Sequence, residues 1–318
     1  MIRLFYGSEQ TFIDVTETAF RRCFDGERIF IPADDSLRAE IFTDPLFGVV
    51  KTVILIRDEN GSMSCTAFGA GSPATIVVAA EEKPRNHSAH RRIQTPPEGW
   101  PDEEKIAFIH RQLEFTGGSM ADEGPEQRMV MRFLDPKARV LELGANIGRN
   151  TLMISSVLDD ETNFVTLECD PISVEMLRNN RYANSFKFHI EPSALSYRKL
   201  MQRAWETTPA EELLPGYQWV RTITFAELVE KYGIEFDTLV ADCEGALYYI
   251  LNDNDELLTN VKTIIVESDY RSVGHKRNVE AIFRSHGLER VYSEALVTTW
   301  NHPFPAECAE TFFEVWKK

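Results

Sequence analysis

The sequence has no CxxC pair and no long apolar run. Because the cysteines are odd in number and widely spaced, neither a zinc ribbon nor a thioredoxin-like redox site is indicated, and free thiols in a reducing compartment are expected. The cysteines are Cys23, Cys65, Cys169, Cys243 and Cys308. No stretch reaches the roughly 18 apolar residues of a membrane-spanning helix. The N-terminus also lacks the basic and apolar regions of a secretory signal. The sequence therefore predicts a cytoplasmic protein with no membrane span.

Positive charge is also scarce. The 34 Lys and Arg residues stand against 50 Asp and Glu residues, which gives a formal net charge of −16. A surface this acidic repels phosphate backbones and anionic lipid, so a nucleic-acid partner is not expected. The chain is 43% hydrophobic and 26% charged, which are ordinary globular values and exclude disordered or collagen-like architectures.

The 318 residues suffice for about two domains at roughly 150 residues each. Residues 1–82 contain short β-type runs separated by turn clusters such as DENGS and GAGSP, which predict a small β-rich module. Residues 83–101 are polar, hold four prolines and predict a linker. From residue 102 to 318, apolar strands alternate with helical patterns, which predicts a parallel sheet covered on both faces. Within this region, residues 196–219 are predicted to be irregular.

Ligands of an open α/β sheet bind outside the carboxyl ends of its strands. Acidic residues end four of the first five predicted strands, namely Glu142, Glu168, Asp242 with the following Glu244, and Glu267. A purely structural sheet has no need of this pattern. Asp242 and Glu267 follow strands that should be neighbours, whose carboxyl ends lie about 5 Å apart, so these two carboxylates are expected within reach of one another.

The turn after the first of these strands has the spacing G-x-x-x-G, with Gly144, Gly148 and, between them, Asn146. Glycine lets the backbone approach a ligand closely, whereas Asn146 stands where the dinucleotide fingerprint has its second glycine and disfavours a pyrophosphate. Glu168, about 20 residues further on, can accept both hydroxyls of a ribose. An adenine nucleoside without phosphate is then the economical ligand, and S-adenosylmethionine fits. The alternative is a turn without a ligand and a solvated carboxylate.

The run VLELGANIGRNTLMI, followed by LECDP, SALS, FDTLVADCEGALYYIL and KTIIVES, resembles the FkbM family of S-adenosylmethionine-dependent methyltransferases. The family's D-x-G-A-N-x-G-x-x-T turn corresponds to residues 142–151, its D-x-E-G-A element to residues 242–246, and its strand ending in Glu to Glu267. The resemblance covers residues 120–318 and departs at Glu142, where the family often has Asp. The N-terminal module carries no such resemblance.

The resemblance implies a class I methyltransferase fold, with a Rossmann-like seven-stranded sheet whose last strand, here TFFEVWKK, is antiparallel. It also implies O-methylation of a hydroxyl on a small-molecule acceptor, either a sugar or glycan or a natural product. By residue matching, Glu168 should hold the ribose, and Ser193 and Ala194 should flank the adenine. Asp242 should face the amino-acid end or the methyl group. The methionine part should be lined by Glu142, Gly144, Ala145, Asn146 and Gly148.

Methyl transfer to a hydroxyl needs an in-line arrangement and removal of a proton. Asp242 and Glu267 could bind Mg²⁺, which prefers oxygen ligands and acidifies a bound hydroxyl. Alternatively, one carboxylate among Asp242, Glu244 and Glu267 acts as a general base. Glu244 could instead serve a helix N-terminus. His275, at the start of a predicted helix, is a further candidate base.

Three other interpretations stay open. The first is a methyltransferase that uses the same methyl donor but acts on a protein or nucleic acid. The second is an NAD-dependent oxidoreductase, which Asn146 disfavours. The third is a non-catalytic cofactor-binding scaffold, in which the acids at the strand ends would have no function. Because every donor motif lies beyond residue 140, the N-terminal module is expected to serve acceptor binding or self-association, the latter giving a homo-oligomer.

Overall fold

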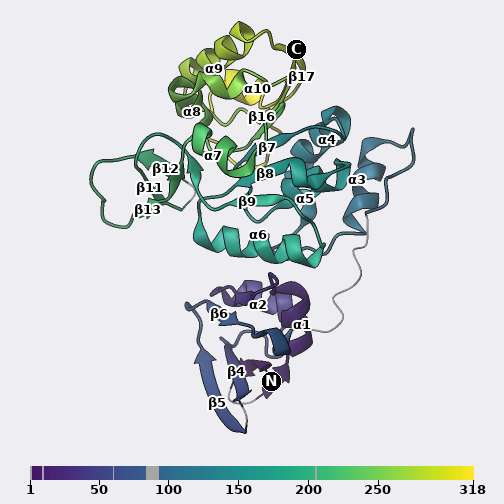
Figure 1. Cartoon of the computed structure of the whole chain (residues 1–318), viewed down its shortest axis with the longest axis vertical. Coiled ribbons are helices and arrows are strands. Elements are labelled where there is room, and N and C mark those ends of the chain that lie inside the picture. Colours follow the sequence, from purple (N-terminus) through teal and green to yellow (C-terminus); the bar gives the residue numbers. More distant parts are fainter. Residues whose placement is uncertain (1, 9–10, 60, 84–92, 205) are drawn as a thin grey trace. The chain divides into compact units, whose positions relative to one another are not determined.

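The computed structural model describes residues 2–8, 11–59, 61–83, 93–204 and 206–318 (Figure 1). Residues 84–92 of the predicted linker lie outside the described residues. The chain forms two compact units. The first unit comprises Met1–Ile93, Gln112–Met120 and Ile172–Phe186, and the second comprises Gln94–Arg111, Ala121–Pro171 and Lys187–Lys318. The predicted boundaries at residues 82 and 102 stay a prediction.

The first unit is rich in β structure, as the sequence predicted for its N-terminal part. Its four-stranded antiparallel sheet has the order β2-β1-β4-β5, and a separate antiparallel pair joins β3 to β6. The strands are β1 (Ile2–Ser8), β2 (Thr11–Asp14), β3 (Arg28–Ile31), β4 (Thr52–Glu59), β5 (Ser62–Phe68) and β6 (Ala74–Val77), and the helices are α1 (Thr16–Arg22) and α2 (Asp35–Phe42).

A fully buried guanidinium ties the loops of this unit together. Arg38 on α2 is 0% exposed. It donates hydrogen bonds to the carbonyl oxygens of Pro32 at 2.7 Å, Phe68 at 3.2 Å, Gly69 at 3.1 Å and Ser72 at 2.6 Å. Burying a cation is costly unless its donors are satisfied, and these four carbonyls satisfy Arg38 without a carboxylate.

The first unit also contains a helix from the middle of the sequence. On α6 (Pro171–Ala183), the Tyr182 ring meets the Phe24 ring edge-on with 5.1 Å between centroids. The Asn179 side-chain amide donates to the Phe30 carbonyl oxygen at 3.0 Å. These contacts make α6 part of the same core as the N-terminal strands.

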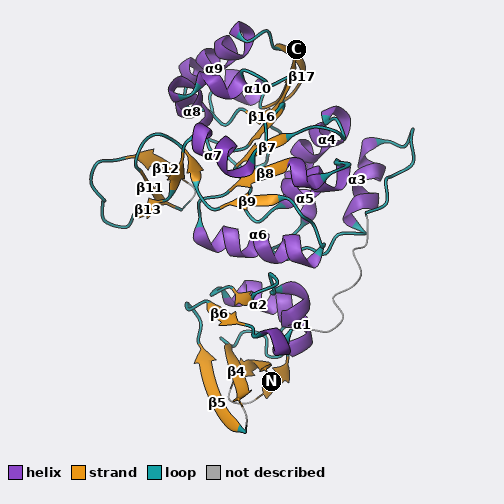
Figure 2. Cartoon of the chain, in the orientation of Figure 1, coloured by secondary structure: helices purple, strands orange, loops and turns teal. Residues whose placement is uncertain are grey.

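The second unit is built on a seven-stranded sheet with the order β17-β18-β16-β15-β7-β8-β9 (Figures 1 and 2). Five neighbouring strands pair in parallel, namely β7 (Val140–Leu143), β8 (Phe164–Leu167), β9 (His189–Glu191), β15 (Thr238–Ala241) and β16 (Thr263–Glu267), and β17 runs in the same direction as these five. β18 (Phe313–Lys317) is antiparallel to both β16 and β17 (Glu289–Glu294). The predicted seven-stranded sheet with an antiparallel last strand is therefore confirmed.

Helices pack on both faces of this sheet, because the central strands β7, β8 and β15 are buried along their whole length. Alternate strand residues such as Leu141, Leu239 and Ile264 join one hydrophobic core with α7 (Phe225–Tyr232), α8 (Leu247–Asp253) and α9 (Val273–Ser285). The strand residues between these point to the other face of the sheet. There Glu142 accepts a hydrogen bond from Thr151 on α5 (Arg149–Val157). There α5 packs against α4 (Gly124–Phe133), which also contacts α3 (Asp102–His110), β16 and β18. A short helix, α10 (Ala306–Glu310), precedes β18.

The expectation of an irregular segment at residues 196–219 was wrong. A three-stranded antiparallel sheet, here called the insertion sheet, forms from β11 (Leu200–Arg203), β12 (Glu206–Pro209) and β13 (Gln218–Val220). It lies in the chain between β10 (Ala194–Leu195) and β14 (Thr222–Ile223), which pair in parallel. Its strands are short and largely polar, so they lack the alternation of apolar and polar residues that indicates a half-buried strand.

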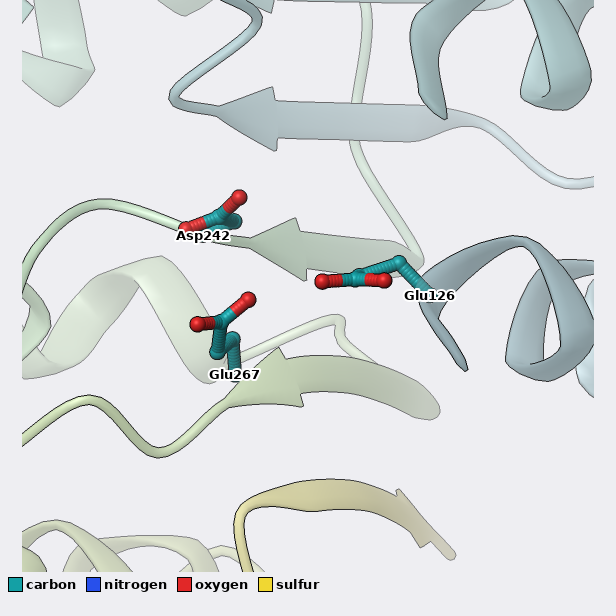
Figure 3. Close-up of side chains that lie close together, drawn as sticks. All are labelled: Glu126, Asp242 and Glu267. Atoms are coloured by element: carbon teal, nitrogen blue, oxygen red, sulfur yellow. The ribbon is translucent and has the colours of Figure 1, made fainter. Parts of the chain in front are cut away.

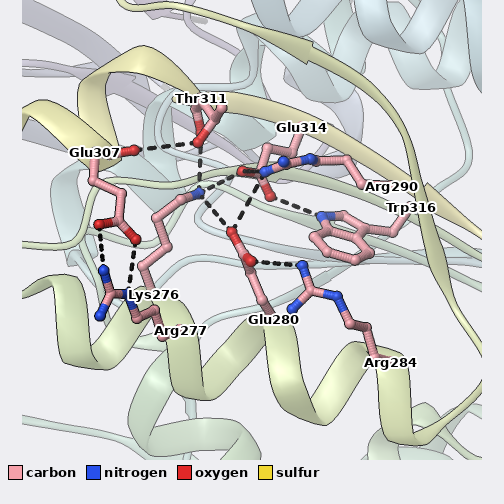
Figure 4. A network of polar contacts seen from close by, with 9 residues as sticks. All are labelled: Lys276, Arg277, Glu280, Arg284, Arg290, Glu307, Thr311, Glu314 and Trp316. Carbon is pink, nitrogen blue, oxygen red and sulfur yellow. Dashed lines mark hydrogen bonds and ion pairs between the residues drawn. The ribbon is translucent and has the colours of Figure 1, made fainter.

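A buried ion-pair network joins α9 to the last strand (Figure 4). Lys276 is 2% exposed and its ammonium donates to the carboxylate of Glu314, which is 1% exposed. Glu314 also accepts hydrogen bonds from Arg290 Nη1 at 3.1 Å and from Trp316 Nε1 at 2.8 Å, and Lys276 lies 3.3 Å from Glu280. Each buried charge thus has several partners, which burial of charge requires.

Candidate active site

The turn after β7 lies directly against the turn after β15. Gly144 has a φ of +89°, and a Cβ at this position would stand 1.6 Å from the carbonyl oxygen of Asp242. Only glycine fits both the left-handed backbone and the contact. Asn146 also has a positive φ of 48°, and Gly148, with a φ of 100°, is the N-cap of α5. The predicted glycine turn is therefore a tight loop at the carboxyl edge of the sheet.

Glu168, at the end of β8, lies beside this loop. Its two carboxylate oxygens accept hydrogen bonds from the backbone N–H groups of Asn146 and Asp170, each at 2.7 Å. Burial raises the pKa of Glu168 although these backbone donors act in the opposite direction. Each carboxylate oxygen has more than one acceptor site, so Glu168 can hold the loop and still accept from two hydroxyls of a ligand.

Glu142 lies beneath the loop and is 2% exposed. Its Oε2 accepts hydrogen bonds from the hydroxyls of Thr151 on α5 and Thr166 on β8, both at 2.6 Å. Burial raises the pKa of Glu142 to about 7, despite these two donors. The contacts join β7, α5 and β8 under the glycine turn, so Glu142 positions the loop.

The segment after β9 is held by a second buried carboxylate. Ser193 is 0% exposed and its hydroxyl donates to Glu191 at 2.9 Å. Glu191 also pairs with Lys231 at 2.5 Å and accepts from the Tyr232 hydroxyl at 3.0 Å. The Ser193 hydroxyl is therefore engaged, whereas the neighbouring Ala194 is half-buried and offers an apolar surface next to this cluster.

The structure brings Asp242 and Glu267 together and adds a third carboxylate, Glu126 (Figure 3). One oxygen from each residue lies within 4.8 Å of the other two. Asp242 follows β15, Glu267 ends β16 and Glu126 comes from α4, so three separate elements fix this carboxylate triad. Sequence reasoning missed Glu126. The signal was a charged residue on the buried side of an amphipathic helix, since Glu126 is only 8% exposed.

The electrostatics of the triad favour a proton or a cation among its members. Burial raises the pKa of Asp242 well above its ordinary value, and the charges of Asp269 and Glu126 raise it further. Burial and the charge of Asp242 likewise raise the pKa of Glu267 well above its ordinary value. The Glu267 carboxyl is within hydrogen-bonding distance of Glu126. Two more acids surround the triad, since burial raises the pKa of Glu123 and of Asp269 to about 7. All these groups cannot be ionised together without a compensating positive charge.

Glu244 and His275 lie outside the triad. Glu244 is exposed, has a φ of +53°, and its backbone N–H, like that of Gly245, donates to the Asp269 carboxylate. The His275 ring stacks on Tyr248 with 3.8 Å between centroids and an angle of 4° between planes. The structure thus groups three carboxylates at one point and places the imidazole in an aromatic stack.

Solved structures of other proteins resemble this chain at low identity. An O-methyltransferase from Bacillus cereus, in complex with SAH, is 12% identical, with 68% of this chain and 90% of that chain covered and a TM-score of 0.38. A ribosomal protein methylase from Lactobacillus delbrueckii subsp. bulgaricus is 9% identical, with 64% and 81% covered and a TM-score of 0.38. A protein of the NADB-Rossmann superfamily from Streptococcus agalactiae is 16% identical, with 60% and 67% covered and a TM-score of 0.37.

No protein-family model matches the chain, and neither does any curated protein. The class rests on the second unit itself, whose strand order, antiparallel last strand and glycine turn define a class I methyltransferase-like fold. Among the described residues, no helix has the length and apolar character needed to cross a membrane.

Proposed function

We propose that the chain is an S-adenosylmethionine-dependent O-methyltransferase that acts on a hydroxyl of a sugar, glycan or natural-product acceptor, as its resemblance to the FkbM family implies. The observation that carries the proposal is the meeting of two loops. The Gly144 turn, with Glu168 beside it, touches the backbone of Asp242, which is a member of the carboxylate triad. A donor site and a proton-accepting site therefore share one edge of the sheet.

The residues around the loop suit the donor. Glu168 would accept hydrogen bonds from the ribose hydroxyls, and Ser193 and Ala194 would flank the adenine. The methionine part would be lined by Gly144, Ala145, Asn146 and Gly148, with Glu142 positioning the loop from below. The nearby acids Asp242, Glu123 and Asp269 give the site a negative potential, which favours a sulfonium over a phosphate. When bound, S-adenosylmethionine supplies an electrophilic methyl group.

The chain's own groups then orient the acceptor and take its proton. Methyl transfer would form an O–C bond as the C–S bond of the donor breaks, and the hydroxyl proton would have to pass to a group of the protein. Asp242 or Glu267 accepts it in the general-base version, and their raised pKa values suit a carboxylate to that role. Glu244 and His275 remain candidates at the same edge, and a metal ion held by Asp242 and Glu267 is the alternative means of acidifying the hydroxyl.

Ligand binding is the first test. Thermal shift with S-adenosylmethionine, S-adenosylhomocysteine and NAD should show stabilisation by the first two compounds alone. Stabilisation by NAD instead, or by none of the three, would contradict the proposal.

Turnover is the second test. Formation of S-adenosylhomocysteine with hydroxyl-bearing acceptors should fall at least 100-fold in Asp242→Asn or Glu267→Gln. The exposed residue Glu307, which pairs with Arg277 on the surface, provides the control, and Glu307→Gln should keep normal turnover. If the Asp242 and Glu267 variants both keep normal turnover, the carboxylate mechanism is wrong, and His275→Ala becomes the next variant to measure.

The role proposed for residues 1–82 is acceptor binding or self-association. This proposal rests on the position of the donor motifs, all of which lie beyond residue 140. Sedimentation of the full chain will show whether it forms a homo-oligomer. Surface substitutions on β5, whose residues are mostly exposed, should alter either the oligomeric state or the KM for the acceptor while the affinity for S-adenosylhomocysteine stays the same.

A further inference from the structure

We propose that Glu126, Asp242 and Glu267 form a binding site for a hard divalent cation of the Mg²⁺ type. The site is three-sided, with Glu126 from helix α4 as the ligand that completes it. The three ligand oxygens lie within 4.8 Å of one another, and their side chains converge on one point (Figure 3).

The buried state of Glu126 is the observation that points to a ligand. The residue is 8% exposed, and its Oε2 is buried without a hydrogen-bond partner. A buried carboxylate oxygen without a donor costs several kcal/mol, and Figure 3 shows this side chain directed at Asp242 and Glu267. A cation bound between the three side chains would compensate the buried charge of Glu126.

The neighbouring cationic side chains are occupied elsewhere. Arg149 pairs with Asp122 and Glu123, both at 3.5 Å, and Arg128 pairs with Glu294 at 2.5 Å. Within the described ranges, no Lys or Arg forms an ion pair with any of the three carboxylates. The compensating charge must therefore come from a proton or from an ion.

A divalent cation fits three carboxylates better than a proton does. One proton can bridge two carboxylates and leaves the third charged, whereas a divalent ion contacts all three and neutralises two charges. Carboxylate oxygen is the ligand type of Mg²⁺ and Mn²⁺, and the absence of His and Cys from the set disfavours Zn²⁺. Mg²⁺ retains waters in such sites. On the proposed function, an acceptor hydroxyl could replace one of these waters, although the cation site itself does not depend on that function.

Cation binding is tested without the methyl donor. The full chain is treated with EDTA, dialysed and titrated with MnCl₂ or MgCl₂ in a calorimeter, and free Mn²⁺ is followed by electron paramagnetic resonance. We expect one Mn²⁺ per chain and a loss of affinity of at least tenfold in Glu126→Gln. The matched control is Glu142→Gln, because Glu142 is an equally buried acid of the same sheet but lies outside the triad. It should change the affinity less than threefold.

The stability of the same variants gives a second measurement. Since an amide removes a buried charge, Glu126→Gln should melt at a higher temperature than the wild type in EDTA, and Mg²⁺ should no longer raise its melting temperature. Absence of saturable Mn²⁺ binding to the wild type, or equal losses of Mn²⁺ affinity in Glu126→Gln and Glu142→Gln, would overturn the proposal. If Glu126→Gln fails to fold, Asp242→Asn is titrated in its place. Binding of S-adenosylhomocysteine is measured separately, so its loss would contradict the proposed function alone.

A different observation concerns the insertion sheet. We infer that Gln202 on β11 is a specificity-determining contact for the adenine base, an inference that rests on the proposed function. Gln202 is 5% exposed, and its Oε1 is buried without a partner. Its side chain lies close enough to the thiol of Cys169, the residue directly after Glu168, to lower the pKa of that thiol. An amide acceptor therefore stands beside the carboxylate that is proposed to hold the ribose.

The unpartnered Oε1 of Gln202 matches one hydrogen-bond donor of the nucleoside in particular. The ribose hydroxyls are assigned to Glu168 in the proposed function, whereas the exocyclic amino group of adenine needs a hydrogen-bond acceptor of its own. A buried polar atom that a ligand satisfies discriminates strongly against analogues that lack the matching group. Gln202 would thus favour an adenine over a hypoxanthine base.

The test compares two ligands in two proteins. Calorimetry with S-adenosylhomocysteine and with S-inosylhomocysteine, which carries an oxo group in place of the amino group, should show a wild-type preference for the adenosyl compound of at least tenfold. Gln202→Met should reduce that preference below threefold. The control is Gln218→Met on the adjacent strand β13, because Gln218 is exposed and pairs with Gln202 in the sheet.

An unchanged preference in Gln202→Met would overturn the inference. Failure of the wild type to bind either ligand would instead contradict the proposed function. Melting temperatures of the variants show whether each chain is folded before it is titrated.

Discussion

Gly144 and Asp242 belong to loops that meet backbone to backbone, since a Cβ on Gly144 would lie 1.6 Å from the Asp242 carbonyl oxygen. The contact couples the proposed donor loop to the carboxylate triad. It also explains why a residue with a φ of +89° must be glycine here, as both the backbone conformation and the space exclude a side chain.

Gly144→Ala should therefore displace both the turn at Gly144 and the turn at Asp242. We expect a loss of about 4 kcal/mol or more in the free energy of unfolding, which is the range of severe backbone lesions, and at least a 100-fold loss of affinity for S-adenosylhomocysteine. Chemical denaturation and calorimetry measure the two effects. Gly233→Ala is the control, because Gly233 also has a positive φ, of 66°, but a methyl group added there would have no atom from another part of the fold within 4 Å. Equal effects of the two substitutions would show that the contact with Asp242 is unimportant.

Glu168→Ala should weaken binding of S-adenosylmethionine by about 1.5–3 kcal/mol, the range for a hydrogen bond to a charged group. The reason is the loss of a carboxylate that can accept from ribose hydroxyls while it holds the N–H of Asn146. Calorimetry measures the affinity. Glu161→Ala, which changes an acid before β8 at the opposite edge of the sheet, is the control and should bind normally. Normal binding by a folded Glu168→Ala would remove this residue from the site.

Glu142 should make stability depend on pH. Its pKa rises from 4.5 to about 7 on folding, so the native state binds more protons than the unfolded state between these values, and stability falls as the pH rises through this window. Glu142→Gln keeps an oxygen for Thr151 and Thr166 but carries no charge. Its free energy of unfolding should exceed that of the wild type by about 3 kcal/mol above pH 7, with the difference shrinking toward pH 5.

Denaturant titrations of both proteins at several pH values measure this difference. The exposed residue Glu289 supplies the control, and Glu289→Gln should follow the wild type at every pH. Parallel curves for wild type and Glu142→Gln would mean that Glu142 stays ionised at no cost in the folded chain.

Lys276→Met should destabilise the second unit by about 3 kcal/mol, because it leaves the buried carboxylate of Glu314 without its ammonium partner. Arg290 and Trp316 remain as donors and limit the loss. The double variant Lys276→Met, Glu314→Gln should recover most of it, since no buried charge is then left unpaired. Thermal denaturation gives both values, and a double variant less stable than Lys276→Met would contradict this account.

A truncated chain that starts at Gly99 tests the predicted domain boundary. The sequence predicts that this fragment still binds S-adenosylhomocysteine. The first unit, however, packs Tyr182 and Asn179 of α6 against Phe24 and the Phe30 carbonyl. We therefore expect the fragment to melt at a lower temperature than the full chain. Tyr182→Ala in the full chain should lower the melting temperature in the same direction. A fragment as stable as the full chain would show that α6 does not need these contacts.

The sequence by itself determined the sheet of the second unit and the acids at its edge. Apolar runs such as FDTLVA and KTIIV are long enough only for buried strands, and the carboxyl ends of parallel strands necessarily meet at one edge. Asp242 and Glu267 could therefore be placed together from their positions in the chain. The glycine turn was also readable, because few residues other than glycine tolerate its backbone.

Only the tertiary structure decided which distant elements join that edge. Glu126 reaches the triad because α4 packs on β16, and Gln202 reaches Cys169 because a polar segment folds into a sheet. In the same way, α6 is assigned to the first unit by Phe24 and Tyr182, which lie far apart in the chain. Such contacts depend on how elements pack across long separations, and the local periodicity of a sequence carries no information about that packing.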